Sequence, residues 1–126
     1  MTTTDWAHLP NAAHIDRVIA SAIANPGQWA AAWGAGRTAE WWEVWDATRD
    51  VLSEQGRYNE WLALHTAVKA AAWESMYDTL LALIAYDDCA YMLDSDPGEL
   101  AVLAKFGDRR AVLLLGACKV FSQLNI

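Results

Sequence analysis

Basic residues, cysteine and long apolar runs are all scarce in this 126-residue sequence. Nine Lys and Arg stand against 16 Asp and Glu, which gives a net charge of −7 and argues against binding to nucleic-acid polymers or an anionic membrane. No run of about 18 apolar residues is free of charges, so we expect no membrane span. The first residues also lack the basic and apolar segments of a secretory signal, and we therefore expect a cytoplasmic protein.

The sequence also lacks the signals of β-structure and of disulfide bonding. Runs of β-branched residues, Asn-Gly turns and strict alternation of apolar and polar residues are missing. The two cysteines, Cys89 and Cys118, fall within helical patterns, which favours two buried free thiols. Because 55% of the residues are hydrophobic, the chain can bury a core, and its length suits one domain over residues 1–126. We predict an all-α protein.

Apolar spacing and capping residues divide the chain into about six helices, which we expect to form one compact bundle. Residues 1–10 are expected to be irregular, and Asn11 is a candidate N-cap for a first helix that continues to about Ala24. Two segments, Asn25-Pro-Gly-Gln28 and Asp96-Pro-Gly-Glu99, place a capping residue before proline and a capping-box partner three positions after the cap. The other expected boundaries are a linker at 34–36, a cap at Thr38, stops at 55–56 and at Gly107, and a cap at Asp108.

The longest predicted helix runs from about Tyr58 to Leu93, because no proline or glycine interrupts this stretch. A continuous helix of that length would span roughly 50 Å, which is long for a domain of this size. A kink near Ala70–Ser75 is therefore also expected. The sequence thus predicts one long central helix, with or without a kink, around which the shorter helices pack.

Eight tryptophans are the most unusual feature of the composition. Most are expected to fill a core opposite small alanines, since an indole buries a large area and keeps one N–H donor. Trp41 and Trp42 point about 100° apart on a helix, so they cannot easily both face one core centre. Together with Trp45 they form a candidate binding surface, because tryptophan is enriched in binding hot spots.

Asp87 and Asp88 are the most unusual polar pair. On a continuous helix both would lie at the edge of an apolar stripe that includes Tyr91. A carboxylate in that place must pair, accept hydrogen bonds or become neutral. Arg109, Arg110 or a tryptophan N–H is a candidate partner. A structural ion-pair network is the favoured interpretation, and a ligand-binding or catalytic carboxylate is the alternative.

Two acidic spacings partly resemble a metal enzyme. All-α nucleoside triphosphate pyrophosphohydrolases hold Mg²⁺ with Glu-x-x-Glu followed by Glu-x-x-Asp on adjacent helices. Here Glu40 and Glu43 match the first spacing, whereas Glu74 and Asp78 are one residue too far apart for the second. Acids at these spacings are also usual on a solvated helix face, so we expect no metal and no cofactor. No catalytic triad, Cys–His pair or phosphate-binding glycine loop can be assembled, and no catalytic residue is predicted.

Three segments of the C-terminal third resemble the tail of small Ala/Trp-rich helical proteins that tailed bacteriophages and some bacteria encode. They are Leu-Ile-Ala-Tyr-Asp-Asp-Cys-Ala-Tyr-Met-Leu-Asp at 83–94, Asp-Pro-Gly-Glu-Leu at 96–100 and Gly-Asp-Arg-Arg-Ala-Val-Leu-Leu-Leu at 107–115. The preceding helix of that family repeats Ala-Trp-Asp-Ala-Ala-Arg units, to which residues 45–50 and 71–74 are similar without a regular repeat. The resemblance implies a phage or bacterial cytoplasm and an accessory gene, and it implies no reaction.

These observations favour a non-enzymatic interaction protein, a phage-type accessory factor that binds a host or phage protein or self-associates as a homo-oligomer. The candidate binding residues are Trp41, Trp42, Trp45, Asp87, Asp88, Tyr91, Arg109 and Arg110. One alternative is a protein that sequesters a small nucleotide, whose phosphates would lie at Lys105, Arg109 and Arg110. The other alternative is the Mg²⁺-dependent pyrophosphohydrolase.

Overall fold

The computed structural model describes residues 6–35, 41–68 and 73–124, apart from the side chains of residues 33–35, 41, 67, 68, 73–75 and 77. Within these residues there are seven α-helices, one 3₁₀ helix and no strand, so the all-α prediction is confirmed. The α-helices are α1 (Ala12–Ala24), α2 (Pro26–Ala35), α3 (Trp41–Glu54), α4 (Tyr58–Val68), α5 (Trp73–Ala85), α6 (Pro97–Lys105) and α7 (Arg109–Leu124), and the 3₁₀ helix is η1 (Ala90–Asp94). None of these helices has both the length and the apolar content of a membrane span.

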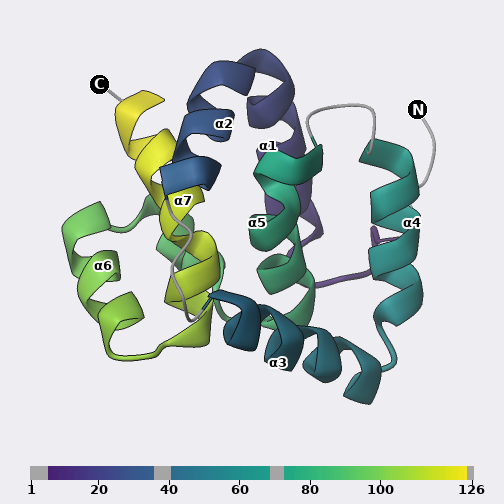
Figure 1. Cartoon of the computed structure of the whole chain (residues 1–126). Helices are drawn as coiled ribbons and strands as arrows, with labels where there is room; N and C mark the ends of the chain where they lie inside the picture. Colours follow the sequence, from purple (N-terminus) through teal and green to yellow (C-terminus); the bar gives the residue numbers. More distant parts are fainter. Residues whose placement is uncertain (1–5, 36–40, 69–72, 125–126) are drawn as a thin grey trace.

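The prediction of one long central helix over 58–93 is wrong for the described residues. Two separate helices, α4 and α5, pack against each other there, and the chain leaves α5 at Ala85 to form a turn and then η1 (Figure 1). Residues 69–72, which include half of the expected kink at 70–75, lie outside the described part of the chain. Neither proline nor glycine ends α5, so the reason for its end lies in contacts with other segments of the chain.

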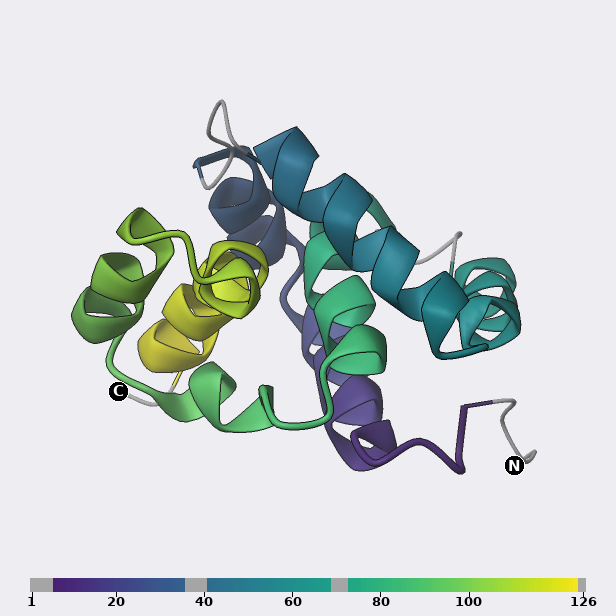
Figure 2. The same ribbon diagram turned by 90° about the horizontal axis from the view of Figure 1, so that it is seen from below.

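Helix α5 lies at the centre of the bundle and contacts α1, α2, α3, α4 and α7. Every residue from Thr79 to Ala85 is buried, as expected for a helix that is apolar on all sides. Helix α3 crosses one end of this arrangement, which the view from below shows clearly (Figure 2). Helix α6 lies at the outer edge of the molecule in both views and packs chiefly on α7.

Most tryptophans with described side chains belong to the core. Trp6, Trp29, Trp45 and Trp61 are buried, and Trp42 is exposed. The Trp29 ring meets Phe121 edge-on, with 5.7 Å between ring centroids, and its N–H donates to Ser21 Oγ at 3.0 Å. These contacts support the expectation that an indole in this core keeps a polar partner.

The capping predictions are confirmed at the C-terminal helices. Asp96 accepts a 3.0 Å hydrogen bond from the backbone N–H of Glu99, and Asp108 accepts one from the N–H of Arg110. Helix α6 ends at Lys105, and Gly107 two residues later has a φ of 88°. The N–H of Asp108 then donates a 3.0 Å hydrogen bond to the Leu103 carbonyl. This pattern is the Schellman motif, in which glycine adopts the left-handed conformation after the last helical turn.

Both asparagines occupy the predicted positions before α1 and α2, but their side chains do not make the expected capping bonds. Asn25 precedes α2 as expected, but its side-chain amide donates backwards to the Ser21 carbonyl. Asn11 precedes α1 and makes no side-chain capping bond. Instead, its amide donates to two carbonyls, each at 2.9 Å: that of Leu83 near the end of α5 and that of Tyr86 directly after α5. The acceptors of Asn11 are distant in sequence and are brought close by packing, whereas Asn25 donates locally, to a carbonyl four residues earlier at the end of α1.

Candidate functional site

The outer face of α3 carries an exposed indole that contacts a buried indole of the same helix. Trp42 is 58% exposed and meets the buried Trp45 ring edge-on at 6.4 Å between centroids. The guanidinium carbon of Arg49 lies 5.2 Å from the Trp45 centroid, and Arg49 also approaches Asp46 at 3.7 Å. Trp41 begins α3, but its side chain lies outside the described residues. Of the predicted tryptophan surface, the structure therefore brings together Trp42 and Trp45 and exposes Trp42.

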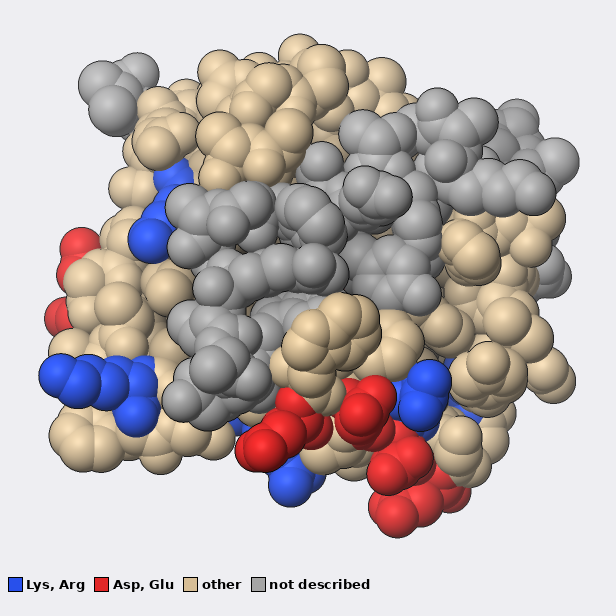
Figure 3. Space-filling model, viewed as in Figure 1, with Lys and Arg blue, Asp and Glu red and all other residues tan. Residues whose placement is uncertain are grey.

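Exposed acids run along the same helix. They recur at spacings of three and four residues, which places them on one side of α3, and Figure 3 shows acidic side chains gathered there. The acids are Glu43, Asp46, Asp50 and Glu54. This acidic stripe, beside the exposed Trp42, is complementary to a basic surface and can attract it electrostatically.

Asp87 and Asp88 do not lie on a helix, which corrects their predicted position. Both are exposed in the turn after α5, because the helix has already ended at Ala85. Asp87 pairs with Arg57 at 2.6 Å, and this contact raises the pKa of the Arg57 guanidinium. Asp88 pairs with Arg110 at 3.3 Å. Each acid thus has an ion-pair partner, as the favoured interpretation expects, although Arg57 was not among the predicted partners.

Arg110 is the centre of a small ion-pair network at the start of α7. It contacts Asp108 at 3.0 Å and Asp88 at 3.3 Å, and the hydrogen bond to Asp108 is the main reason that its pKa is raised. The same hydrogen bond lowers the pKa of the Asp108 carboxyl. A nucleotide phosphate at Arg110 would have to displace two carboxylates, which does not favour the nucleotide alternative. Arg109 beside it is exposed.

Apolar side chains are exposed on the outer side of α6, the helix whose inner side buries Leu100. Leu100 is buried against the bundle, whereas Val102, Leu103 and Phe106 are exposed, Phe106 by 84%. We call these three residues the α6 patch. Tyr91 of η1, a predicted binding residue, is also exposed, by 60%. The sequence does contain a partial signal for the α6 patch, because apolar residues occur on all sides of this nine-residue helix.

Only two of the four acids of the metal hypothesis have described side chains. Glu43 is exposed on α3 and Asp78 lies on α5, while Glu40 and the Glu74 side chain fall outside the described residues. Among the described residues, no group of three or more His, Cys, Asp or Glu side chains is placed to hold a metal ion. The described geometry thus offers no support for a divalent-cation site.

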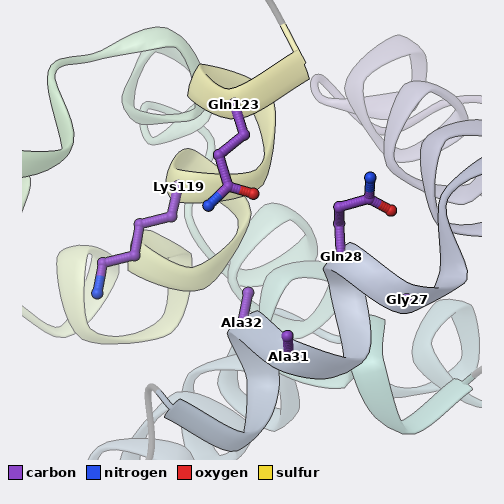
Figure 4. Close-up of a pocket in the computed structure, with 6 residues that line it drawn as sticks. All are labelled: Gly27, Gln28, Ala31, Ala32, Lys119 and Gln123. Carbon is purple, nitrogen blue, oxygen red and sulfur yellow. The ribbon is translucent and has the colours of Figure 1, made fainter.

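An open groove of about 460 Å³ lies between α2 and α7 (Figure 4). Its residues are Gly27, Gln28, Ala31, Ala32, Lys119 and Gln123. Alanine side chains form its floor, the Gln123 amide extends from α7 above them, and the groove gathers neither several charges nor a nucleophile. Such a lining provides contact area and offers no reactive centre.

Both cysteines are buried free thiols, as the sequence predicts. Burial raises the pKa of Cys89 to about 12, and it also raises the pKa of Cys118. The thiols donate to backbone carbonyls, Cys89 to Ala82 at 3.5 Å and Cys118 to Ser95 at 3.0 Å. A protonated and buried thiol is a poor nucleophile, so neither group suits covalent catalysis.

The described surfaces suit contact with another macromolecule: an exposed indole, an acidic stripe and an apolar helix face. No protein-family model, curated protein or solved structure matches this chain.

Proposed function

We propose that this chain is a non-enzymatic interaction protein that binds other proteins through its exposed aromatic and apolar side chains. The observation that carries the proposal is the α6 patch, where Phe106 is 84% exposed beside Val102 and Leu103. Removing apolar area from water is favourable, and clusters of exposed apolar residues mark interaction sites more often than single residues do.

The outer face of α3 supports the same proposal from a second position. The buried Trp45 supports the exposed Trp42 ring, and an indole held in this way can bury a large area against a partner at little entropic cost. The neighbouring acids favour a partner with basic side chains at this face.

The biological setting that we propose is a phage-type accessory factor in a bacterial cytoplasm. This setting depends on the resemblance of residues 83–94, 96–100 and 107–115 to the Ala/Trp-rich helical proteins, and on the acidic composition. In that setting the partner would be a host or phage protein.

Capture from a bacterial extract tests the proposal. The immobilised full chain is compared with Phe106→Ser and Trp42→Ser, and the retained proteins are quantified by mass spectrometry. We expect at least one protein to be retained by the unmodified chain and lost with one of these variants. Ile23→Ser is the matched control, because Ile23 is 59% exposed on α1 and belongs to neither surface. Equal retention by all four chains would contradict the proposal.

A further inference from the structure

The α6 patch is bordered by one acid and one base. Val102 points directly away from the buried Leu100 side of the helix, and Glu99 and Lys105 are both exposed. At about 100° per residue, Glu99 lies about 60° to one side of Val102 and Lys105 about 60° to the other. They also lie about 4.5 Å below and above Val102 along the helix axis. The two charges are therefore placed diagonally across the apolar centre.

This diagonal arrangement is complementary to itself. Consider a two-fold axis that lies in the plane of the interface and passes through Val102, so that the two copies of α6 cross each other steeply. This axis brings each Glu99 to the Lys105 of the other copy. The same operation brings Val102 to Val102 and Phe106 to Phe106, because both lie near the axis. Two-fold interfaces pair the same surface on both subunits, so a surface that carries its own counter-charge suits this symmetry.

We propose that the α6 patch binds the α6 patch of a second copy of this chain. This inference rests on the proposed function, since it names the partner of the same surface. The outer face of α3 is a poor choice for self-association, because its acidic stripe would face an identical acidic stripe. On the side of α6, Figure 3 shows both acidic and basic side chains among uncharged ones, and the exposed Glu99 and Lys105 of this helix carry opposite charges.

The exposed position of α6 allows such contact. The helix packs chiefly on α7 and lies at the edge of the molecule in both ribbon views, so a second copy can approach without meeting another helix first (Figures 1 and 2). Two nine-residue helices that cross steeply bury less than the roughly 800 Å² per partner of a standard interface. We therefore expect a weak dimer in rapid exchange, with a Kd on the order of 10–100 µM.

Sedimentation equilibrium of the full chain tests the inference through a charge exchange. From low micromolar to near-millimolar concentration, the average mass of the unmodified chain should rise from 13.9 kDa towards twice that value. Glu99→Lys and Lys105→Glu should each stay monomeric, because each places like charges opposite each other. An equimolar mixture of the two variants should dimerise again, since the lysine introduced in one chain then meets the glutamate introduced in the other. Phe106→Ala should weaken association of the natural chain about tenfold.

Matched controls separate a specific interface from general adhesion. Glu54→Lys makes the same charge change on α3 and should dimerise at least as well as the unmodified chain, and thermal unfolding by circular dichroism verifies that each variant is folded. A monomeric natural chain over the whole range would overturn the inference, as would a mixture that associates no better than its separate components. If the natural chain is monomeric but Phe106→Ser still loses a captured protein, self-association fails and the proposed function stands. If nothing is captured either, both fail.

Discussion

The side-chain amide of Asn11 donates a 2.9 Å hydrogen bond to the carbonyl oxygen of Leu83, which lies 72 residues later in the chain. It is part of a wider arrangement at the end of α5. The Tyr86 carbonyl also accepts from Asn11, the Ala85 carbonyl accepts from Gln55 at 2.8 Å, and the Ile84 carbonyl accepts from Arg57 at 3.0 Å. The last carbonyls of a helix lack partners within it, and here side chains from two other segments supply them. These contacts fix the end of α5 and the turn that holds Asp87 and Asp88.

Replacing Asn11 with alanine should lower the stability of the fold. Asn11 is 3% exposed, so its loss leaves two carbonyls with reduced access to water and without their donor. We expect the free energy of unfolding to fall by about 1–3 kcal/mol, measured by urea denaturation followed by circular dichroism. Asn59→Ala, at an exposed position on α4, is the control and should change stability by less than about 0.5 kcal/mol. Equal effects of the two substitutions would show that the long-range bonds are unimportant.

Arg57 should depend on the shape of its guanidinium as well as on its charge. One guanidinium nitrogen reaches both the Ile84 carbonyl and Asp87, and the second nitrogen contacts Asp87 at 3.3 Å. Arg57→Lys keeps the charge but cannot make the forked contacts, so it should recover less than half of the roughly 1–2 kcal/mol lost in Arg57→Ala. Arg49→Ala is the matched control, because its contact with Asp46 is longer and exposed. If urea denaturation showed that Arg57→Lys is as stable as the natural chain, the charge of Arg57 alone would explain its contribution.

Asp108 should make stability depend on pH in the acid range. Its pKa in the fold is lowered, chiefly by the hydrogen bond from Arg110, so the ionised carboxylate stabilises the fold above its unfolded pKa near 3.9. That stabilisation is lost as the pH falls through the folded value. Asp108→Asn keeps a good capping residue but removes the charge, so its urea midpoint should be lower at pH 7 and change less between about pH 5 and pH 2. Parallel curves for the natural chain and Asp108→Asn would refute the role of Asp108.

Parts of the fold could be predicted because their chemistry is local. Asp96, Asp108 and Gly107 act within a few residues of their own position, so a capping pattern or a stop before a new helix is visible in the sequence. The end of α5 could not be predicted in this way. It depends on donors from Asn11 and from the turn at 55–57, and only the tertiary structure brings these donors to its carbonyls.

The candidate site was only partly visible in the sequence for a similar reason. The 100° divergence of Trp41 and Trp42 predicts that one of them leaves the core, and Trp42 is indeed exposed. The α6 patch was missed because Leu100, Leu103 and Phe106 recur every third residue and suggest one stripe, whereas at about 100° per residue Phe106 lies about 120° from the buried Leu100. Spacing shows which residues share a face, but it does not show how many neighbours a helix has to bury them.

The two thiols should be unreactive in the folded protein. Cys89 has a pKa of about 12, and Cys118 is buried with a raised pKa, so at pH 8 very little thiolate is present on either. We expect Ellman's reagent to release almost no colour from the native chain and two equivalents after unfolding in urea. If either cysteine of the native chain reacted with Ellman's reagent as fast as free cysteine does, the burial of that thiol would be contradicted.

Two glycines near α7 should respond in opposite directions to the same substitution. Gly116 lies inside α7 against α2, and a β-carbon there would meet the Ala32 carbonyl oxygen at 3.5 Å, an ordinary contact distance. Because alanine is favoured over glycine within a helix, Gly116→Ala should raise stability by about 0.5–1 kcal/mol. Gly107 has a φ of 88°, which an L side chain rarely adopts, so Gly107→Ala should lower stability by about 1 kcal/mol or more although open space surrounds it. Thermal and urea unfolding measure both effects. If Gly116→Ala were less stable than the natural chain, α2 and α7 would pack more closely than this distance indicates. If Gly107→Ala had the stability of the natural chain, the turn after α6 would be able to adopt another conformation.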